Sequence, residues 1–232
     1  MARALIVQHT ASEGLGWFQE WLPAAGVDVH PIHPYLGHRV PPSVEGDALI
    51  VLGGPMGALD DEAAVWLPSV RALLATAVDD GVPTLGVCLG AQLLAAAGGG
   101  SVVRGEAGPE LGFGEVSVSA ADDVLLPSGT LPVVQWHFDT VSVLPDGATV
   151  LASSDRYPVQ AFRVGDVAWG LQFHIEATLP MVADWANADT DTINTSLGRT
   201  AEDVVSEVAA KQFSLLSAGK AITRRFAEVI TG

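Results

Sequence analysis

The only cysteine of the chain, Cys88, lies where an apolar run passes into a run rich in alanine and leucine. Its surroundings read GVCLGAQ, and the flanking Gly86 and Gly90 permit the close backbone approach that a sharp turn from strand to helix requires. Such a turn lifts a side chain above the carboxyl edge of a sheet, beside helix amides whose positive field favours a thiolate. Cys88 is therefore a candidate nucleophile, and a buried structural cysteine is the alternative interpretation.

A thiolate nucleophile needs a base, and the segment QFHIE at residues 172–176 offers a candidate. His174 comes at the end of an apolar run, and Glu176 follows two residues later. Alternate residues of an extended chain point to the same side, so Glu176 could hold the tautomer of His174 while His174 exchanges a proton with Cys88. In the alternative interpretation, His174 is a satisfied histidine at a strand end and Glu176 caps the next helix.

A glycine-rich segment, LGGPMG at residues 52–57, follows another apolar run and should lie at the same edge of the sheet as Cys88. Its glycines could present backbone N–H groups to a developing oxyanion, together with the amide of Leu89. The segment matches neither the Gly-Lys-Ser/Thr phosphate loop nor the Gly-x-Gly-x-x-Gly dinucleotide pattern. It is either part of an oxyanion hole or an ordinary glycine-rich turn.

The first half of the chain must position these residues, and it alternates short apolar runs with amphipathic stretches. Several runs are apolar on both faces, which is typical of parallel strands covered by helices on both sides. This alternation predicts an α/β fold with an open, mostly parallel sheet. The expected strands cover residues 4–7, 27–30, 48–52 and 83–87, and the expected helices cover residues 16–24, 63–78 and 92–97.

The second half has a different pattern, in which short apolar runs are separated by turn sequences such as PDG and VGD. These runs predict an additional antiparallel strand region with hairpins. From about residue 179 the pattern favours helices, with a polar loop or lid at residues 187–199 and a last helix near residues 201–230. The strand candidates of this half are residues 114–118, 133–136, 149–151 and 159–162.

Composition and charge exclude several classes of function. The 232 residues are 49% hydrophobic and carry a formal net charge of −16. Nucleic acids and anionic membrane surfaces both need a basic patch, so we expect neither as a partner. A single cysteine cannot form an internal disulfide, and the N-terminal apolar run is too short for a signal peptide or a membrane span. We therefore expect a cytoplasmic protein that forms one unit over residues 1–232.

Taken together, the segments LGGPMG, GVCLGAQ and QFHIE, in this order, resemble the class I (triad) glutamine amidotransferase family. The resemblance extends from Ala4 to about Trp185, and LGGPMG and QWHFD resemble most closely the solitary relatives of the GMP synthetase amidotransferase domain. It implies a flavodoxin-like sheet with flanking helices. It also implies a catalytic core at about residues 1–185, with residues 186–232 as a helical C-terminal extension.

The resemblance implies a role for each member of a Cys-His-Glu triad. Cys88 would attack the γ-carboxamide of glutamine, or another γ-glutamyl amide, to form a γ-glutamyl thioester that water then hydrolyses. His174 would relay the proton to the departing amine, and Glu176 would orient His174. The family often has proline where this chain has Ile175, but an extended isoleucine can adopt a similar geometry, so we expect the triad to form.

The resemblance also implies the residues that bind the substrate. The amides of Gly54 and Leu89 would form the oxyanion hole, and Gln92 would help to hold the amino-acid end of glutamine. His137 and Asp139, in the segment QWHFD, would contribute to the same end. No cofactor and no metal ion are implied.

Three interpretations of the biological role remain open. The chain is a glutaminase component whose ammonia a separate synthetase subunit uses in trans, or it is a free-standing hydrolase of a small γ-glutamyl compound. The third interpretation is a non-catalytic binding or redox-sensing protein on the same fold, for which an intact His174 and Glu176 are not required. No ATP-pyrophosphatase domain follows the amidotransferase-sized unit in this sequence, so we do not expect the chain to make GMP by itself.

Overall fold

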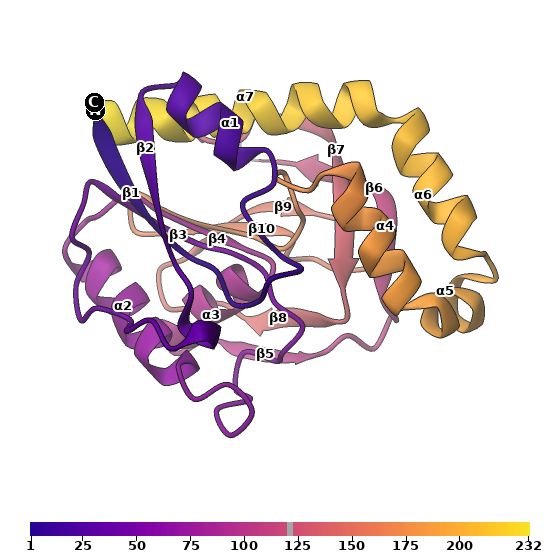
Figure 1. Ribbon diagram of the computed structural model, residues 1–232, viewed down its shortest axis with the longest axis horizontal. Helices are drawn as coiled ribbons and strands as arrows, with labels where there is room; N and C mark the ends of the chain where they lie inside the picture. Colours follow the sequence, from indigo (N-terminus) through magenta and orange to yellow (C-terminus); the bar gives the residue numbers. More distant parts are fainter. Residues whose placement is uncertain (120–122) are drawn as a thin grey trace.

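A nine-stranded mixed sheet forms the centre of the computed structural model, which describes residues 1–119 and 123–232 (Figure 1). The strand order is β2-β1-β3-β4-β11-β10-β9-β6-β7. The first five strands in this order are parallel to one another, and their order is that of the flavodoxin-like sheets. Their bounds are Val27–Ile32 (β2), Ala2–Val7 (β1), Ala48–Val51 (β3), Thr84–Val87 (β4) and Ala168–Leu171 (β11).

Helices cover both faces of the parallel half, which explains why its strands are apolar on both sides (Figure 1). On one face lie α1 (Phe18–Ala24) and α7 (Gln212–Thr231), and on the other lie α2 (Leu67–Asp79) and α3 (Leu89–Ala97). The predicted α/β fold is confirmed. All three helices begin at other residues than expected: α1 begins two residues later, α2 begins four residues later, after turns around Asp60, and α3 begins directly after Cys88.

The predicted antiparallel region continues the same sheet beyond β11. Strands β10, β9, β6 and β7 are each antiparallel to their neighbours, and a separate two-stranded sheet pairs β5 with β8. The bounds are Ser101–Arg104 (β5), Glu110–Val118 (β6), Gly129–His137 (β7), Asp139–Val143 (β8), Thr149–Ser153 (β9) and Ala161–Val164 (β10).

Residues 187–199 are not the polar loop or lid that the sequence suggested. They contain the end of α4 (Leu179–Ala188) and all of α5 (Thr190–Leu197), which ends at Gly198 in the left-handed conformation. Ile193 is buried in a cluster with apolar side chains of β6, β7 and α6. This burial stabilises a helix that the polar composition of the segment does not predict. None of the helices in the described ranges is long and apolar enough to cross a membrane.

The expected last helix is two helices, α6 (Ala201–Ala210) and α7, which meet at Lys211. A capping box fixes the start of α6, where Thr200 and Asp203 each accept a hydrogen bond from the other's backbone N–H. The break lets α6 pack against α4 and β6, while α7 turns and runs along the sheet toward α1 (Figure 1).

The packing of α7 on the sheet generates a first prediction. Phe226 of α7 is fully buried, and its ring lies edge-to-face on Trp169 of β11 with the ring centroids 6.3 Å apart. We expect Phe226→Ala to lower the free energy of unfolding by about 3–5 kcal/mol because it leaves a cavity between α7 and the sheet. Chemical denaturation measures this change.

Phe213 provides the matched control, because it lies on the same helix with 89% of its surface exposed. Phe213→Ala should change the free energy of unfolding by no more than about 0.5 kcal/mol. An equal loss of unfolding free energy in the two variants would show that the buried face of α7 does not stabilise the fold.

Candidate active site

The loops that follow β1, β3, β4 and β11 meet at the carboxyl edge of the parallel half of the sheet. Strand order reverses direction between β1 and β3, and open α/β sheets bind their ligands at such a point. A cavity of about 290 Å³ opens at this edge. Its lining includes Cys88, His174, Gln92, His137 and Asp139, so the structure brings most of the sequence-predicted site residues together.

Cys88 occupies a strained turn between β4 and α3. Its φ of 51° and ψ of −107° make it the only residue other than glycine with positive φ in the described ranges. A Cβ on Gly86 would lie 2.5 Å from the backbone of Gly90, and a Cβ on Gly90 would lie 2.0 Å from the Val51 carbonyl oxygen. The predicted sharp turn is confirmed, and close packing of three backbone segments explains both glycines.

His174 and Glu176 form a buried hydrogen-bonded pair beside the cavity. The distance from His174 Nδ1 to Glu176 Oε1 is 2.7 Å, and both side chains are almost fully buried. Because the carboxylate accepts the Nδ1 proton, the free ring position is Nε2, for which no described residue provides a hydrogen-bond partner. Glu176 does not cap α4, because the N-cap of that helix is Thr178.

The electrostatics of the three residues are coupled. Burial acts to lower the pKa of His174, but the charges of Glu176 and Cys88 outweigh it and raise that pKa well above its ordinary value. Burial raises the pKa of the Cys88 thiol, and His174 opposes this rise. A negative charge on the sulfur is therefore favoured only when His174 carries its proton.

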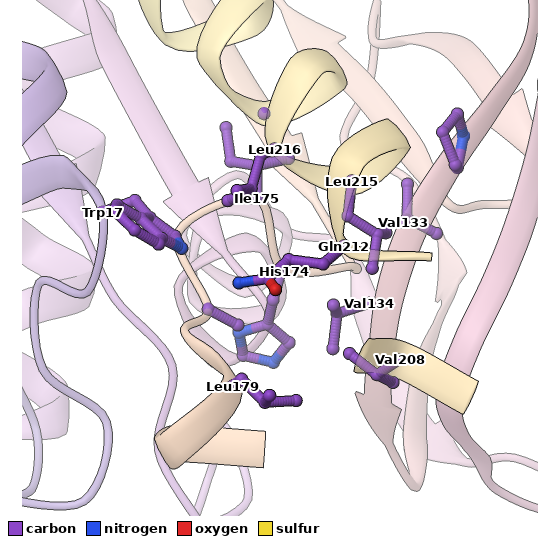
Figure 2. A pocket seen from close by; sticks show the side chains of 13 residues that line it. Trp17, Val133, Val134, His174, Ile175, Leu179, Val208, Gln212, Leu215 and Leu216 are labelled. Carbon is purple, nitrogen blue, oxygen red and sulfur yellow. The ribbon is translucent and has the colours of Figure 1, made fainter. Parts of the chain in front are cut away.

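Apolar side chains of β7 and α7 lie beside His174. Figure 2 shows a small second cavity, of about 30 Å³, beside His174 and between β7 and the start of α7. Its walls are mostly apolar, and on the other side the ring of Trp185 lies 4.8 Å from the His174 ring. The labelled residues in this view include Val133, Val134, Ile175, Leu179 and Leu215.

The glycine loop after β3 lies against the first turn of α3. A Cβ on Gly54 would lie 2.8 Å from Leu89 Cδ2 and 3.1 Å from His9 Cβ, so the two expected oxyanion donors are on neighbouring segments. The N–H of Leu89 is in the first turn of α3, where backbone N–H groups have no partner within the helix. Beneath this loop, burial lowers the pKa of His9 to about 4, and His9 accepts a hydrogen bond from Trp66 Nε1 at 3.0 Å.

Gln92 connects the expected substrate-binding segment to the nucleophile. Its Nε2 donates to the Asp139 carbonyl oxygen and to Gln172 Oε1, both at 3.2 Å. Gln172 in turn approaches Cys88 Sγ with its Nε2 at 3.8 Å. The sequence analysis did not single out Gln172, although it lies in the same QFHIE segment as His174.

The side chain of His137 is engaged within the protein. Its Nε2 lies 3.0 Å from Glu110 Oε2, and its Nδ1 lies 3.1 Å from the Asp139 carbonyl oxygen. Both partner oxygens are hydrogen-bond acceptors, so the His137 ring holds the segment around Asp139 in place. Burial acts to raise the pKa of Glu110, but hydrogen bonding from His137 outweighs it and lowers that pKa.

Arg104, which the sequence analysis did not identify, lies beside Asp139. Its Nη1 is 3.6 Å from Asp139 Oδ1, and its guanidinium lies over the Phe138 ring at 4.5 Å from the centroid. This pair supplies one charge of each sign at the expected amino-acid end of the cavity.

Three acidic residues at the cavity, Glu13, Asp184 and Asp189, were also missed. Glu13 follows β1, and a Cβ on Gly53 would lie 2.1 Å from Glu13 Oε2 and 3.2 Å from His174 Cε1. Burial raises the pKa of Glu13 to about 7. The position of Glu13 after an apolar strand could have identified it, whereas nothing in the sequence places Asp189 near Cys88.

Comparisons with known proteins agree on similarity to glutamine amidotransferases. Residues 24–181 match the family model of the class-I glutamine amidotransferases. The chain is 30% identical over 190 residues to the glutamine amidotransferase-like protein YfeJ of Salmonella typhimurium, a match that covers 78% of each chain. It is also 33% identical over 150 residues to a GMP synthase of Porphyromonas gingivalis, which covers 62% of this chain but only 28% of that enzyme.

Among solved structures, a glutamine amidotransferase from Thermotoga maritima superposes with a TM-score of 0.86 at 29% identity. The superposition covers 98% of both chains, so it includes the helices after residue 185.

The raised pKa of Glu13 generates a prediction about stability. The folded state holds a proton that the unfolded state loses above the ordinary carboxyl value of 4.5. Ionising Glu13 therefore costs folding free energy that grows as the pH rises from about 4.5 to 7 and then stays constant. Glutamine cannot ionise, so Glu13→Gln removes this cost. We expect the change in the free energy of unfolding caused by the mutation to be more favourable at pH 8 than at pH 4.5, by at most about 3 kcal/mol.

Denaturation of the wild type and the variant at the two pH values measures this difference. Glu45→Gln is the control, because Glu45 is exposed and lies before β3, at the opposite end of that strand from the cavity. An equal change in the free energy of unfolding at both pH values would contradict the raised pKa of Glu13.

Proposed function

The chain belongs to the class I glutamine amidotransferase family, and we propose that it hydrolyses the γ-carboxamide of glutamine or of a related γ-glutamyl amide. The observation that carries the proposal is the geometry of Cys88, His174 and Glu176. The thiol is held on a strained turn at the mouth of a cavity, and the partnerless His174 Nε2 borders the same cavity. Glu176 holds the opposite ring nitrogen at 2.7 Å.

In the first half of the proposed reaction, His174 Nε2 takes the proton of the Cys88 thiol. The sulfur attacks the amide carbon, and the developing oxyanion is held by the N–H groups of Gly54 and Leu89. The C–N bond then breaks as His174 returns the proton to the departing ammonia or amine. The enzyme is left as a γ-glutamyl thioester on Cys88.

In the second half, water attacks the thioester carbon and loses a proton to His174. The C–S bond breaks, glutamate leaves, and the proton returns to the Cys88 sulfur. Glu176 stabilises the imidazolium that forms twice in each cycle. The cycle consumes one water molecule for each amide and needs no group beyond the residues of the site.

We assign the amino-acid end of the substrate to the segment around Asp139. The ion pair of Asp139 with Arg104 offers a carboxylate for the α-ammonium group and a guanidinium for the α-carboxylate. Gln92 holds this segment through the Asp139 carbonyl oxygen. Since both ring nitrogens of His137 contact other protein groups, we propose that His137 positions Asp139 and does not bind the substrate through its ring.

The released ammonia or amine has two possible fates. The match to one part of a GMP synthase supports a glutaminase component that supplies a separate synthetase subunit in trans. The full-length superposition on a glutamine amidotransferase of similar size supports a free-standing hydrolase. A non-catalytic redox sensor would not require the buried His174–Glu176 pair.

Two variants test the catalytic triad. Cys88→Ala should abolish glutamate release from glutamine and from γ-glutamyl amides. Glu176→Gln should lower kcat by about 10²- to 10⁴-fold, because it removes the group that stabilises protonated His174. It should also move the alkaline limb of the kcat profile to lower pH, since the pKa of His174 is raised by Glu176.

Glutamate release between pH 5 and 10 measures both effects, and Glu45→Gln is again the matched control. A glutamine-analogue electrophile should label Cys88 covalently in the wild type. Full activity of Cys88→Ala would contradict the proposal, and so would the absence of both turnover and labelling in the wild type.

A further inference from the structure

A second wall of the cavity, formed by the loop after β1, the end of β7 and the end of α4, is not used by the mechanism above. It consists of Glu13, Asp184 and Asp189 together with the indole rings of Trp136 and Trp185. The ring centroids of the two tryptophans lie 5.7 Å apart. We call this set of five residues the acidic wall.

The acidic wall gathers three carboxyl groups at the cavity. In the described parts of the chain, no lysine or arginine forms an ion pair with any of its three carboxylates, and Arg104 at the cavity is paired with Asp139. Asp189 Oδ2 accepts one hydrogen bond, from Trp136 Nε1 at 2.8 Å. Carboxyl groups beside indole rings form a surface that suits an alkylammonium group, because carboxylates bind the ammonium head and indole rings pack on methylene groups.

The backbone holds Glu13 in this position. Gly16 has a φ of 50°, and the next N–H, that of Trp17, donates to the Glu176 carbonyl oxygen at 2.8 Å. Gly53 leaves the space that the Glu13 carboxylate fills, since a Cβ there would lie 2.1 Å from Oε2. The carboxylate is thereby placed against the edge of His174 and not toward bulk solvent.

The acidic wall adjoins the place where the leaving group must be. His174 Nε2 delivers the proton to the departing nitrogen, and this buried, unpartnered atom borders the same cavity. His174 Cε1 and Glu13 Oε2 both approach the same point above Gly53, and the Trp185 ring lies 4.8 Å from the His174 ring. A substituent on the leaving nitrogen therefore extends toward the acidic wall, while the glutamyl end lies at Asp139 and Arg104.

We propose that the site takes γ-glutamyl amides whose leaving amine carries a second, free ammonium group, which Glu13 and Asp189 bind. This inference rests on the proposed function and specifies its substrate class. Hydrolysis adds one water molecule across the C–N bond and releases glutamate and a diamine. An ammonium bound at Glu13 would also lower the pKa of about 7 that burial gives this carboxyl.

Three synthetic amides of matched length test the proposal with the full chain: γ-glutamyl-1,4-diaminobutane, γ-glutamyl-pentylamine and γ-glutamyl-4-aminobutyrate. They differ only in the far end of the leaving group, which is cationic, neutral or anionic. We expect kcat/KM for the cationic amide to exceed that of the neutral amide by at least about tenfold, and the anionic amide to be the poorest. The preference should weaken as the salt concentration rises.

Variants of the acidic wall distinguish a loss of preference for the cationic amide from an equal loss of activity toward all three amides. Glu13→Gln and Asp189→Asn should each lower the ratio of kcat/KM for the cationic amide to that for the neutral amide, and Glu45→Gln should leave the ratio unchanged. Thermal denaturation checks that the variants are folded.

The outcomes distinguish this inference from the proposed function. Equal turnover of the three amides, a ratio unaffected by Glu13→Gln, or turnover of glutamine alone would overturn the substrate class and leave the hydrolytic function intact. Absence of turnover of glutamine and of all three amides, without labelling of Cys88, would overturn both.

Discussion

The contact between the β4–α3 turn and the end of β3 is the constraint on which the site depends. Gly86, Gly90 and the Val51 carbonyl oxygen approach so closely that no Cβ fits between them. This contact holds Cys88 at positive φ, with its N–H bonded to the Leu171 carbonyl oxygen at 2.7 Å. The same packing brings the glycine loop after β3 against Leu89 and sets the nucleophile beside the segment that carries His174. A strained residue is tolerated because the surrounding backbone over-determines its conformation.

Buried charge is the second feature that organises the site. His174 and Glu176 are almost completely excluded from solvent, so each would be costly to ionise alone, and their contact at 2.7 Å offsets that cost. Among the described residues, Nε2 of His174 has no hydrogen-bond partner, and the Cys88 thiol donates to the Trp136 carbonyl oxygen at 3.6 Å. Packing from α7, β7 and Trp185 limits the motion of the imidazole, and the helices after residue 185 therefore contribute to the geometry of the site.

Two parts of the cavity differ in their charges, and this difference would set the orientation of a bound substrate. At Asp139 and Arg104, one charge of each sign matches the zwitterionic end of a free amino acid. At the acidic wall, carboxyl groups and indole rings lie together, and no lysine or arginine of the described residues forms an ion pair with these carboxyl groups. A chain with a net charge of −16 thus places part of its acidity at the cavity that Cys88 and His174 line.

The sequence by itself determined the nucleophilic turn, the His174–Glu176 pair and the α/β class, because each depends on local rules: glycines at a tight turn, alternation along a strand, and apolar runs covered on both faces. It did not determine the helix at residues 190–197, whose polar composition is outweighed by the burial of Ile193. Nor did it place Glu13, Arg104 and Asp189 at the cavity, or turn the ring of His137 toward Glu110. Those positions depend on contacts between segments far apart in the chain, and only the tertiary packing of α4, β5 and the loop after β1 brings these segments together.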